Sequence, residues 1–91
     1  MAHTVYFDIN MDTDIKALVE KIQSEILKRK GSVEGDEKEG SVILPAPIGA
    51  VHADYKVLDG QLELTINKKP FIVPYSKIES EIKRLIKEYV V

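Results

Sequence analysis

The sequence predicts a single α+β domain over residues 1–91, in which an antiparallel sheet packs against two helices. Three observations predict this class. Short segments in which apolar and polar residues alternate indicate strands with one buried face. Two longer segments with apolar residues three and four positions apart indicate amphipathic helices. Asp59-Gly60, between alternating residues 51–57 and 62–67, is the strongest short signal for a β-hairpin.

The first strand and the first helix are expected in the N-terminal third of the chain. The strand covers residues 4–10 and buries one side. The helix is expected to begin with Asp12 or Thr13 as its N-cap, and Asp14 favours the helix dipole. Gly31 is expected to end it in the left-handed conformation. The apolar stripe of this helix comprises Ile15, Leu18, Val19, Ile22, Ile26 and Leu27.

The middle of the chain predicts two weaker strands. Residues 32–40 are polar and contain glycine, which favours a weak strand that enters an exposed turn near residues 36–38; a mobile loop is the alternative. Residues 41–44 predict a returning strand. We expect Pro45 and Pro47 to interrupt it. Because proline cannot donate a hydrogen bond to a ladder, this stretch is expected to be an edge, a bulge or a crossing loop.

The last element is predicted to be a helix that runs from Ser76 to Val91. Ser76 and Glu79 have the spacing of a capping box, and Pro74 stands just outside. The predicted order is therefore β-α-β-β-β-β-α. The simplest way to bury one face of every element is a two-layer fold, with both helices on one face of a sheet of four or five antiparallel strands. The other sheet face is expected to be wet and to carry Tyr6, Asp8, His52, Asp54, Lys56, Glu63, Thr65 and Asn67.

Composition excludes several classes of protein. The net charge of −2, with both signs interspersed, gives no basic face for nucleic acid. The chain has no cysteine, which excludes disulfides and thiolate metal sites. The apolar runs are too short to span a membrane, and the N-terminus lacks the pattern of a signal peptide. A cytoplasmic location is therefore expected.

The order of elements also resembles a known group of folds. Residues 49–58 and 61–67, the Lys69-Pro70-Phe71 segment and the stripe of the last helix match the pattern of helix-grip folds, which include START-like and Bet v 1-like proteins. More closely, the chain is similar to a family of short bacterial polyhydroxyalkanoic acid system proteins. The resemblance implies a helix-grip-like fold and a role as an accessory protein of a polyhydroxyalkanoate granule or storage system. Fold analogy alone does not carry that function.

Residues suited to catalysis are sparse. His52 and Asp54 point the same way on one predicted strand, and Glu63 could oppose them in a weak metal or polar site. We favour a solvated strand face with cross-strand charge pairs. The serines stand in no recognisable nucleophile motif. No catalytic residue, metal or cofactor is expected, and the chain is not expected to be an enzyme; a small enzyme that uses this face is the least favoured alternative.

Apolar residues in connecting segments give the best candidate site, because connections are usually polar. We expect a contact surface formed by Ile48, Val51, Phe71, Ile72 and Tyr75. The alternative is a crossover that plugs the core with Phe71 and Val73. The predicted function is a non-enzymatic binding or interaction module. Its partner would be a second subunit of a homodimer, another protein or a small apolar ligand.

Size limits how such a ligand could bind. An empty cavity of about 300 Å³, at the low end for ligand pockets, would cost roughly 7 kcal/mol at about 24 cal/mol per Å³. The net stability of a domain is only about 5–15 kcal/mol. We therefore predict a filled core and a ligand site that is shallow or at an interface.

Overall fold

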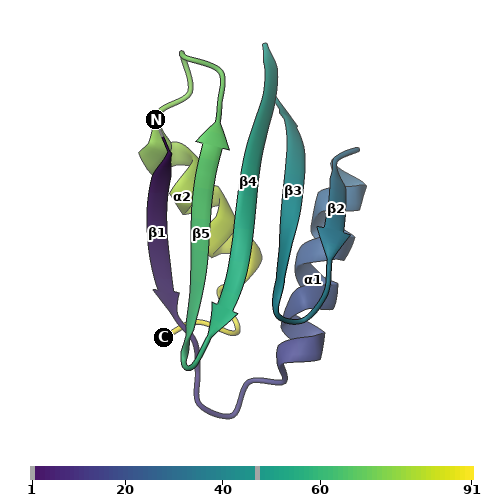
Figure 1. The fold of residues 1–91 in the computed structure, drawn as a ribbon, viewed down its shortest axis with the longest axis vertical. Helices are drawn as coiled ribbons and strands as arrows, with labels where there is room; N and C mark the ends of the chain where they lie inside the picture. Colours follow the sequence, from purple (N-terminus) through teal and green to yellow (C-terminus); the bar gives the residue numbers. More distant parts are fainter. Residues whose placement is uncertain (1, 47) are drawn as a thin grey trace.

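The computed structural model describes residues 2–46 and 48–91 and shows an α+β fold with one antiparallel five-stranded sheet and two helices (Figure 1). The order β-α-β-β-β-β-α confirms the predicted order. The elements are β1 (His3–Asp8), α1 (Ile15–Lys28), β2 (Ser32–Gly35), β3 (Glu39–Ala46), β4 (Gly49–Leu58), β5 (Gln61–Lys68) and α2 (Tyr75–Leu85).

The sheet has the strand order β1-β5-β4-β3-β2. Strands β2 to β5 follow one another as hairpins, and β1 pairs with the outer side of β5. The turn between β4 and β5 is formed by Asp59 and Gly60, with Gly60 at φ +76°, so the predicted hairpin is confirmed. The polar segment after α1 forms the strand pair β2–β3 and not the alternative mobile loop.

Strand β3 continues through Pro45, so the predicted interruption there is wrong, whereas the alternative that this stretch is an edge is confirmed for Pro45. Pro45 pairs with Ala50 of β4. On the other side of β3, the pairing with β2 extends only to Ser32, opposite Ile43. Pro45 therefore lies beyond the end of β2, at an open edge where a missing N–H group leaves no ladder bond unmade. Pro47, the other proline of that prediction, lies outside the described residues.

Helix α1 begins and ends one or two residues away from the expected positions. The N-cap of the helix is Asp14. The Asp14 carboxylate accepts hydrogen bonds from the N–H groups of Lys16 and Ala17 at 3.0 and 3.3 Å. At the other end Lys30 has φ +64°, and the N–H of Gly31 donates to the carbonyl of Ile26 at 2.9 Å. Lys30 therefore occupies the left-handed position of a Schellman motif, whereas the prediction gave that position to Gly31.

Helix α2 is shorter than predicted at its C-terminal end. It begins at Tyr75 after Pro74, without a side-chain cap, so the predicted capping box of Ser76 is wrong. It ends at Leu85, and the chain then turns back to β1, where Val90 bridges Ile9. The N–H of Val91 donates to the carbonyl of Asp8 at 2.9 Å. The open edge of β1 offers backbone partners to the last residues, which a longer helix would not use.

The core is one apolar cluster to which both helices and all strands except β2 contribute buried side chains. Helix α1 packs near β2 and β3, and α2 packs near β1 (Figure 1). The buried residues are Phe7, Ile9, Leu18, Val19, Ile22, Ile26, Val42, Val51, Ala53, Tyr55, Leu62, Leu64, Ile66, Ile78 and Ile86.

Tyr55 ties the short edge strand to the sheet. It lies opposite Gly40, and a Cβ atom at Gly40 would come within 2.5 Å of its ring. The absence of a side chain at Gly40 lets the ring cross β3, where its hydroxyl donates to the carbonyl of Asp36 at 2.6 Å. Burial and then the charge of Asp36 raise the pKa of Tyr55.

The connections between the elements fall at two ends of the molecule (Figure 1). The lower end in that view carries the connections at residues 9–14, 36–38 and 59–60. The upper end carries the connection at residues 29–31, the link between β3 and β4, and residues 69–74. We use these two names below.

Candidate functional site

Two segments far apart in the sequence meet at the upper end. The start of β4 lies beside the connection that leads from β5 to α2 (Figure 1). A Cβ atom at Gly49 would lie 3.8 Å from Cγ of Pro70, which is ordinary van der Waals contact. The connection is folded by a turn in which the N–H of Val73 donates to the carbonyl of Pro70 at 3.0 Å.

Three large apolar side chains are exposed on these two segments. Phe71 is 91% exposed, Ile48 67% and Ile72 58%. We call these three residues the apolar tip. Val73 is partly buried against the core and Phe71 is not, so only one of the two residues that could have plugged the core does so.

The other two predicted contact residues, Val51 and Tyr75, do not belong to the apolar tip. Val51 is buried in the core and cannot contribute to a surface. Tyr75 is half-buried, and its ring stacks on His3 with 4.3 Å between ring centroids and 20° between planes. Nζ of Lys69 lies 4.8 Å from the centroid of the same ring. The stack with His3 and the contact with Lys69 join the start of α2 to β1 and to the connection beneath the apolar tip.

Basic residues surround the apolar tip. Residues 67–78 include Lys68, Lys69 and Lys77 and no acidic residue, and residues 42–53 contain no acidic residue either. This local excess of positive charge was missed in the sequence because the whole chain has a net charge of −2. A window over residues 67–78 alone would have found it.

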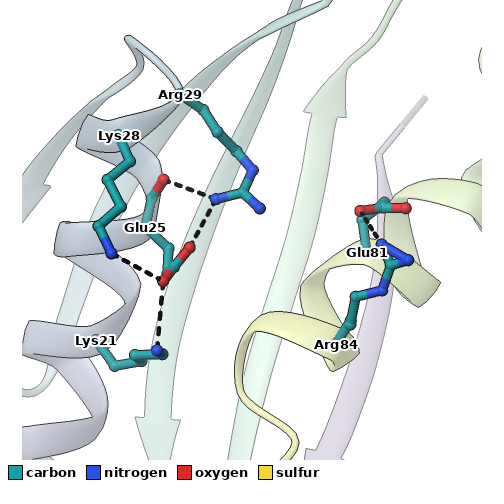
Figure 2. A network of polar contacts seen from close by, with 6 residues as sticks. All are labelled: Lys21, Glu25, Lys28, Arg29, Glu81 and Arg84. Carbon is teal, nitrogen blue, oxygen red and sulfur yellow. Dashed lines mark hydrogen bonds and ion pairs between the residues drawn. The ribbon is translucent and has the colours of Figure 1, made fainter.

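The end of α1 adds further cations on the same side of the molecule. Glu25 is the centre of a network with Lys21, Lys28 and Arg29, at N–O distances of 3.3, 3.6 and 2.7 Å (Figure 2). The hydrogen bond from Arg29, followed by that from Lys21, lowers the pKa of Glu25 to about 2. One carboxylate therefore faces three cations, and Lys30 follows directly after them.

The outer face of the sheet carries polar pairs whose groups are satisfied by one another. Asp54 accepts hydrogen bonds from Oγ of Ser41 at 2.8 Å and from Nδ2 of Asn67 at 2.9 Å. Glu63 lies opposite Lys56 and not opposite His52. Within residues 2–46 and 48–91, no three side chains of the His, Asp or Glu type are grouped to hold a metal ion. For His52, Asp54 and Glu63, these contacts favour the hypothesis of a solvated strand face over that of a metal site.

Cross-strand contacts also account for an exposed tyrosine on this face. Tyr6 lies opposite Glu63, and a hydrogen bond with that carboxylate, followed by its charge, raises the pKa of Tyr6. The ring is 55% exposed, so the phenol stands in water beside an anion. A raised pKa keeps this hydroxyl protonated and does not prepare it as a base or nucleophile.

The interior is filled, as the stability argument predicts. The void between the two helices and the sheet has a volume of only about 30 Å³ and an entirely apolar lining. Larger hollows of about 300 and 380 Å³ lie beside α1 and on the outer sheet face, and both are open and lined by charged side chains. None of these three spaces resembles an enclosed apolar ligand pocket.

Comparison with known proteins finds no match among protein-family models, curated proteins or solved structures. No helix in the described part of the chain is long and apolar enough to cross a membrane.

Proposed function

We propose that this chain is a small non-enzymatic binding module whose contact surface is the apolar tip. The observation that carries the proposal is the exposure of Phe71, at 91%, together with two exposed isoleucines on segments that lie close to each other. Connections on a protein surface are usually polar, and a contiguous group of exposed apolar side chains marks an interaction site.

The size of the apolar tip indicates what kind of contact it makes. A fully exposed aromatic side chain offers on the order of 200 Å², so the three side chains together offer a few hundred Å². A stable dimer buries about 800 Å² on each partner. The apolar tip alone is therefore too small for a permanent homodimer. It suits a reversible contact with an apolar partner.

The side-chain contacts on the outer face of the sheet support a non-enzymatic role. Asp54, the carboxylate nearest to His52 along the strand, already accepts two hydrogen bonds from neighbouring side chains. Each oxygen of Asp54 is held by a side chain of a neighbouring strand, Oδ1 by Ser41 and Oδ2 by Asn67. This cross-strand pairing supports a structural role.

We also propose that the fold is helix-grip-like. Both helices contribute to one apolar cluster with the sheet, which supports a helix-grip-like two-layer arrangement with both helices on one face. The role implied by the resemblance to polyhydroxyalkanoic acid system proteins stays the second candidate function. A granule surface is also an apolar partner, and a gene neighbourhood with enzymes of polymer storage would favour it.

The proposal is tested with a fluorescent dye that binds exposed apolar surface. We expect the native chain to bind anilinonaphthalene sulfonate reversibly, and the I48S/F71S/I72S variant to lose most of that binding. A matched control, M11S/L58S, removes exposed apolar side chains from the lower end and should retain the binding. Tyr75 is left unchanged because its ring stacks on His3.

Circular dichroism and urea unfolding decide whether the variants are folded. If I48S/F71S/I72S unfolds, the three side chains belong to the core and the proposed function is wrong. If it is folded and binds the dye as well as the native chain does, the apolar tip is not the binding surface.

A further inference from the structure

We propose that the partner of the apolar tip is the surface of a lipid bilayer that contains anionic lipids. This inference rests on the proposed function, because it names the partner of the same site. Four observations support it: the charges around the apolar tip, the place of the lysines on the fold, the opposite charge at the far end, and the aliphatic character of the tip.

The charges on the two segments that carry the apolar tip have one sign. Lys68, Lys69 and Lys77 flank the tip, and residues 42–53 and 67–78 contain no carboxylate. Lys30 adds a further cation from the end of α1, beyond the Glu25 network in Figure 2. Basic residues beside exposed apolar ones form the usual combination of an interfacial membrane site, since headgroups attract the cations and the acyl boundary accepts the apolar groups.

The position of Lys77 is difficult to explain by folding alone. It lies in the first turn of α2, which has no acidic residue and no side-chain cap. The positive end of the helix dipole favours Asp or Glu at such a position and disfavours lysine. An anionic surface in front of this turn would reverse that preference, because it compensates both the lysine and the dipole.

The lower end has the opposite charge. Its connections carry Asp12 and Asp14 before α1, Asp36 and Glu37 between β2 and β3, and Asp59 between β4 and β5, with Lys38 as the cation among them. A negatively charged surface would repel this end and attract the other. The long axis of the molecule, 38 Å against 22 and 19 Å, would then stand upright on the bilayer.

The composition of the apolar tip favours lipid over nucleic acid or an acidic protein. Two of its three side chains are isoleucines, which cannot stack on bases. The charged side chains beside the tip are all lysines, whose point charges suit a layer of headgroups better than the directional hydrogen bonds of a specific protein interface. Acyl chains require neither stacking nor hydrogen bonds.

Cosedimentation with vesicles tests the proposal. We expect the full chain to sediment with vesicles of phosphatidylcholine and phosphatidylserine, and only weakly with vesicles of phosphatidylcholine alone. F71S/I72S should reduce the partition coefficient by at least about tenfold. K68Q and K77Q should each reduce it by about fivefold at low salt. The matched controls M11S and K38Q, at the lower end, should leave it unchanged.

A tryptophan reporter shows which end enters the bilayer. The chain has no tryptophan, so F71W and M11W each carry a single one. We expect the emission of F71W to shift to shorter wavelength when anionic vesicles are added, and that of M11W to stay constant. Added salt should reverse the shift, because the attraction of the lysines to the headgroups is screened.

Other outcomes overturn the inference. If the native chain binds the apolar dye but no anionic vesicle, the bilayer is the wrong partner and the proposed function still stands. Equal losses in F71S/I72S and M11S would show that binding does not use this end. If single-stranded RNA or heparin is bound equally well by the native chain and F71S/I72S, charge alone is responsible and the apolar tip has no part in it.

Discussion

The first turns of the two helices lie at opposite ends of the molecule and are completed in different ways. At the lower end, Asp14 caps α1 with two hydrogen bonds to backbone N–H groups. At the upper end, α2 starts after Pro74 with no side-chain cap and with Lys77 in its first turn. One helix start has the residues that stabilise a helix, and the other has residues that do not.

The connections at the two ends differ in the same sense. The carboxylate of Asp36 accepts hydrogen bonds from the N–H groups of Lys38 and Glu39, which also lower its pKa, and the carbonyl of Asp36 binds Tyr55. The side chains of Phe71 and Ile72 remain largely in solvent. Hydrogen bonds explain the polar residues Asp14 and Asp36 of the lower end by folding, whereas no packing contact explains the exposure of Phe71 and Ile72. Met11 and Leu58 are exposed at the lower end as well, but they stand next to Asp12 and Asp59, whereas Phe71 and Ile72 follow closely after Lys68 and Lys69.

The prediction with the largest expected effect makes the same substitution, isoleucine to alanine, just before α2 and just after it. Ile86 follows the helix and is fully buried, whereas Ile72 precedes it and is 58% exposed. We expect Ile86→Ala to lower the free energy of unfolding by about 2–5 kcal/mol because it leaves a cavity. Ile72→Ala should change it by less than about 0.5 kcal/mol. Urea unfolding measures both, and a cost above 1 kcal/mol at Ile72 would mean that the upper end is also part of the core.

Much of the fold could be predicted because its signals are local. Alternation in residues 51–57 and 62–67, with Asp59-Gly60 between them, depends only on neighbouring residues. The errors arose where a distant element decides. Whether Pro45 breaks β3 depends on how far β2 extends, and the end of α2 depends on the open edge of β1.

The candidate site was predicted in part for the same reason. Ile48, Phe71 and Ile72 stand on the surface where an apolar connection suggested they would, and Gly49 and Pro70 lie close to each other on the two segments. Val51 was assigned to the contact surface although the alternation of its strand already placed it on the buried face. Lys68, Lys69 and Lys77 stand within one stretch of twelve residues and could have been grouped from the sequence, whereas the nearness of residues 42–53, which also lack carboxylates, needed the folded chain.

A second prediction separates stability from binding at the start of α2. Lys77→Glu should stabilise the domain by about 0.3–1 kcal/mol, because a carboxylate suits the positive end of the helix dipole. The same change should weaken sedimentation with anionic vesicles. Thermal unfolding at low salt gives the stability, and K77Q separates loss of the lysine from gain of a carboxylate. A variant that is more stable and still binds vesicles as the native chain does would contradict a functional role for Lys77.

The smallest expected effect concerns the charge network at the end of α1. The folded-state pKa of Glu25, about 2, lies below its ordinary value of 4.5, so the network adds stability above pH 4.5 that is lost as the pH falls toward 2. Glu25→Gln should therefore make the loss of stability over that interval less steep, as followed by urea unfolding at a series of pH values. Adding Arg29→Gln to Glu25→Gln should change the slope no further, because the hydrogen bond from Arg29 is the main cause of the shift. Unchanged acid sensitivity in Glu25→Gln would show that the cations of α1 are held by solvent and not by Glu25.

Because Glu25→Gln also leaves Lys28 and Arg29 without their carboxylate, it should increase vesicle binding and so sharpen the contrast between the two ends.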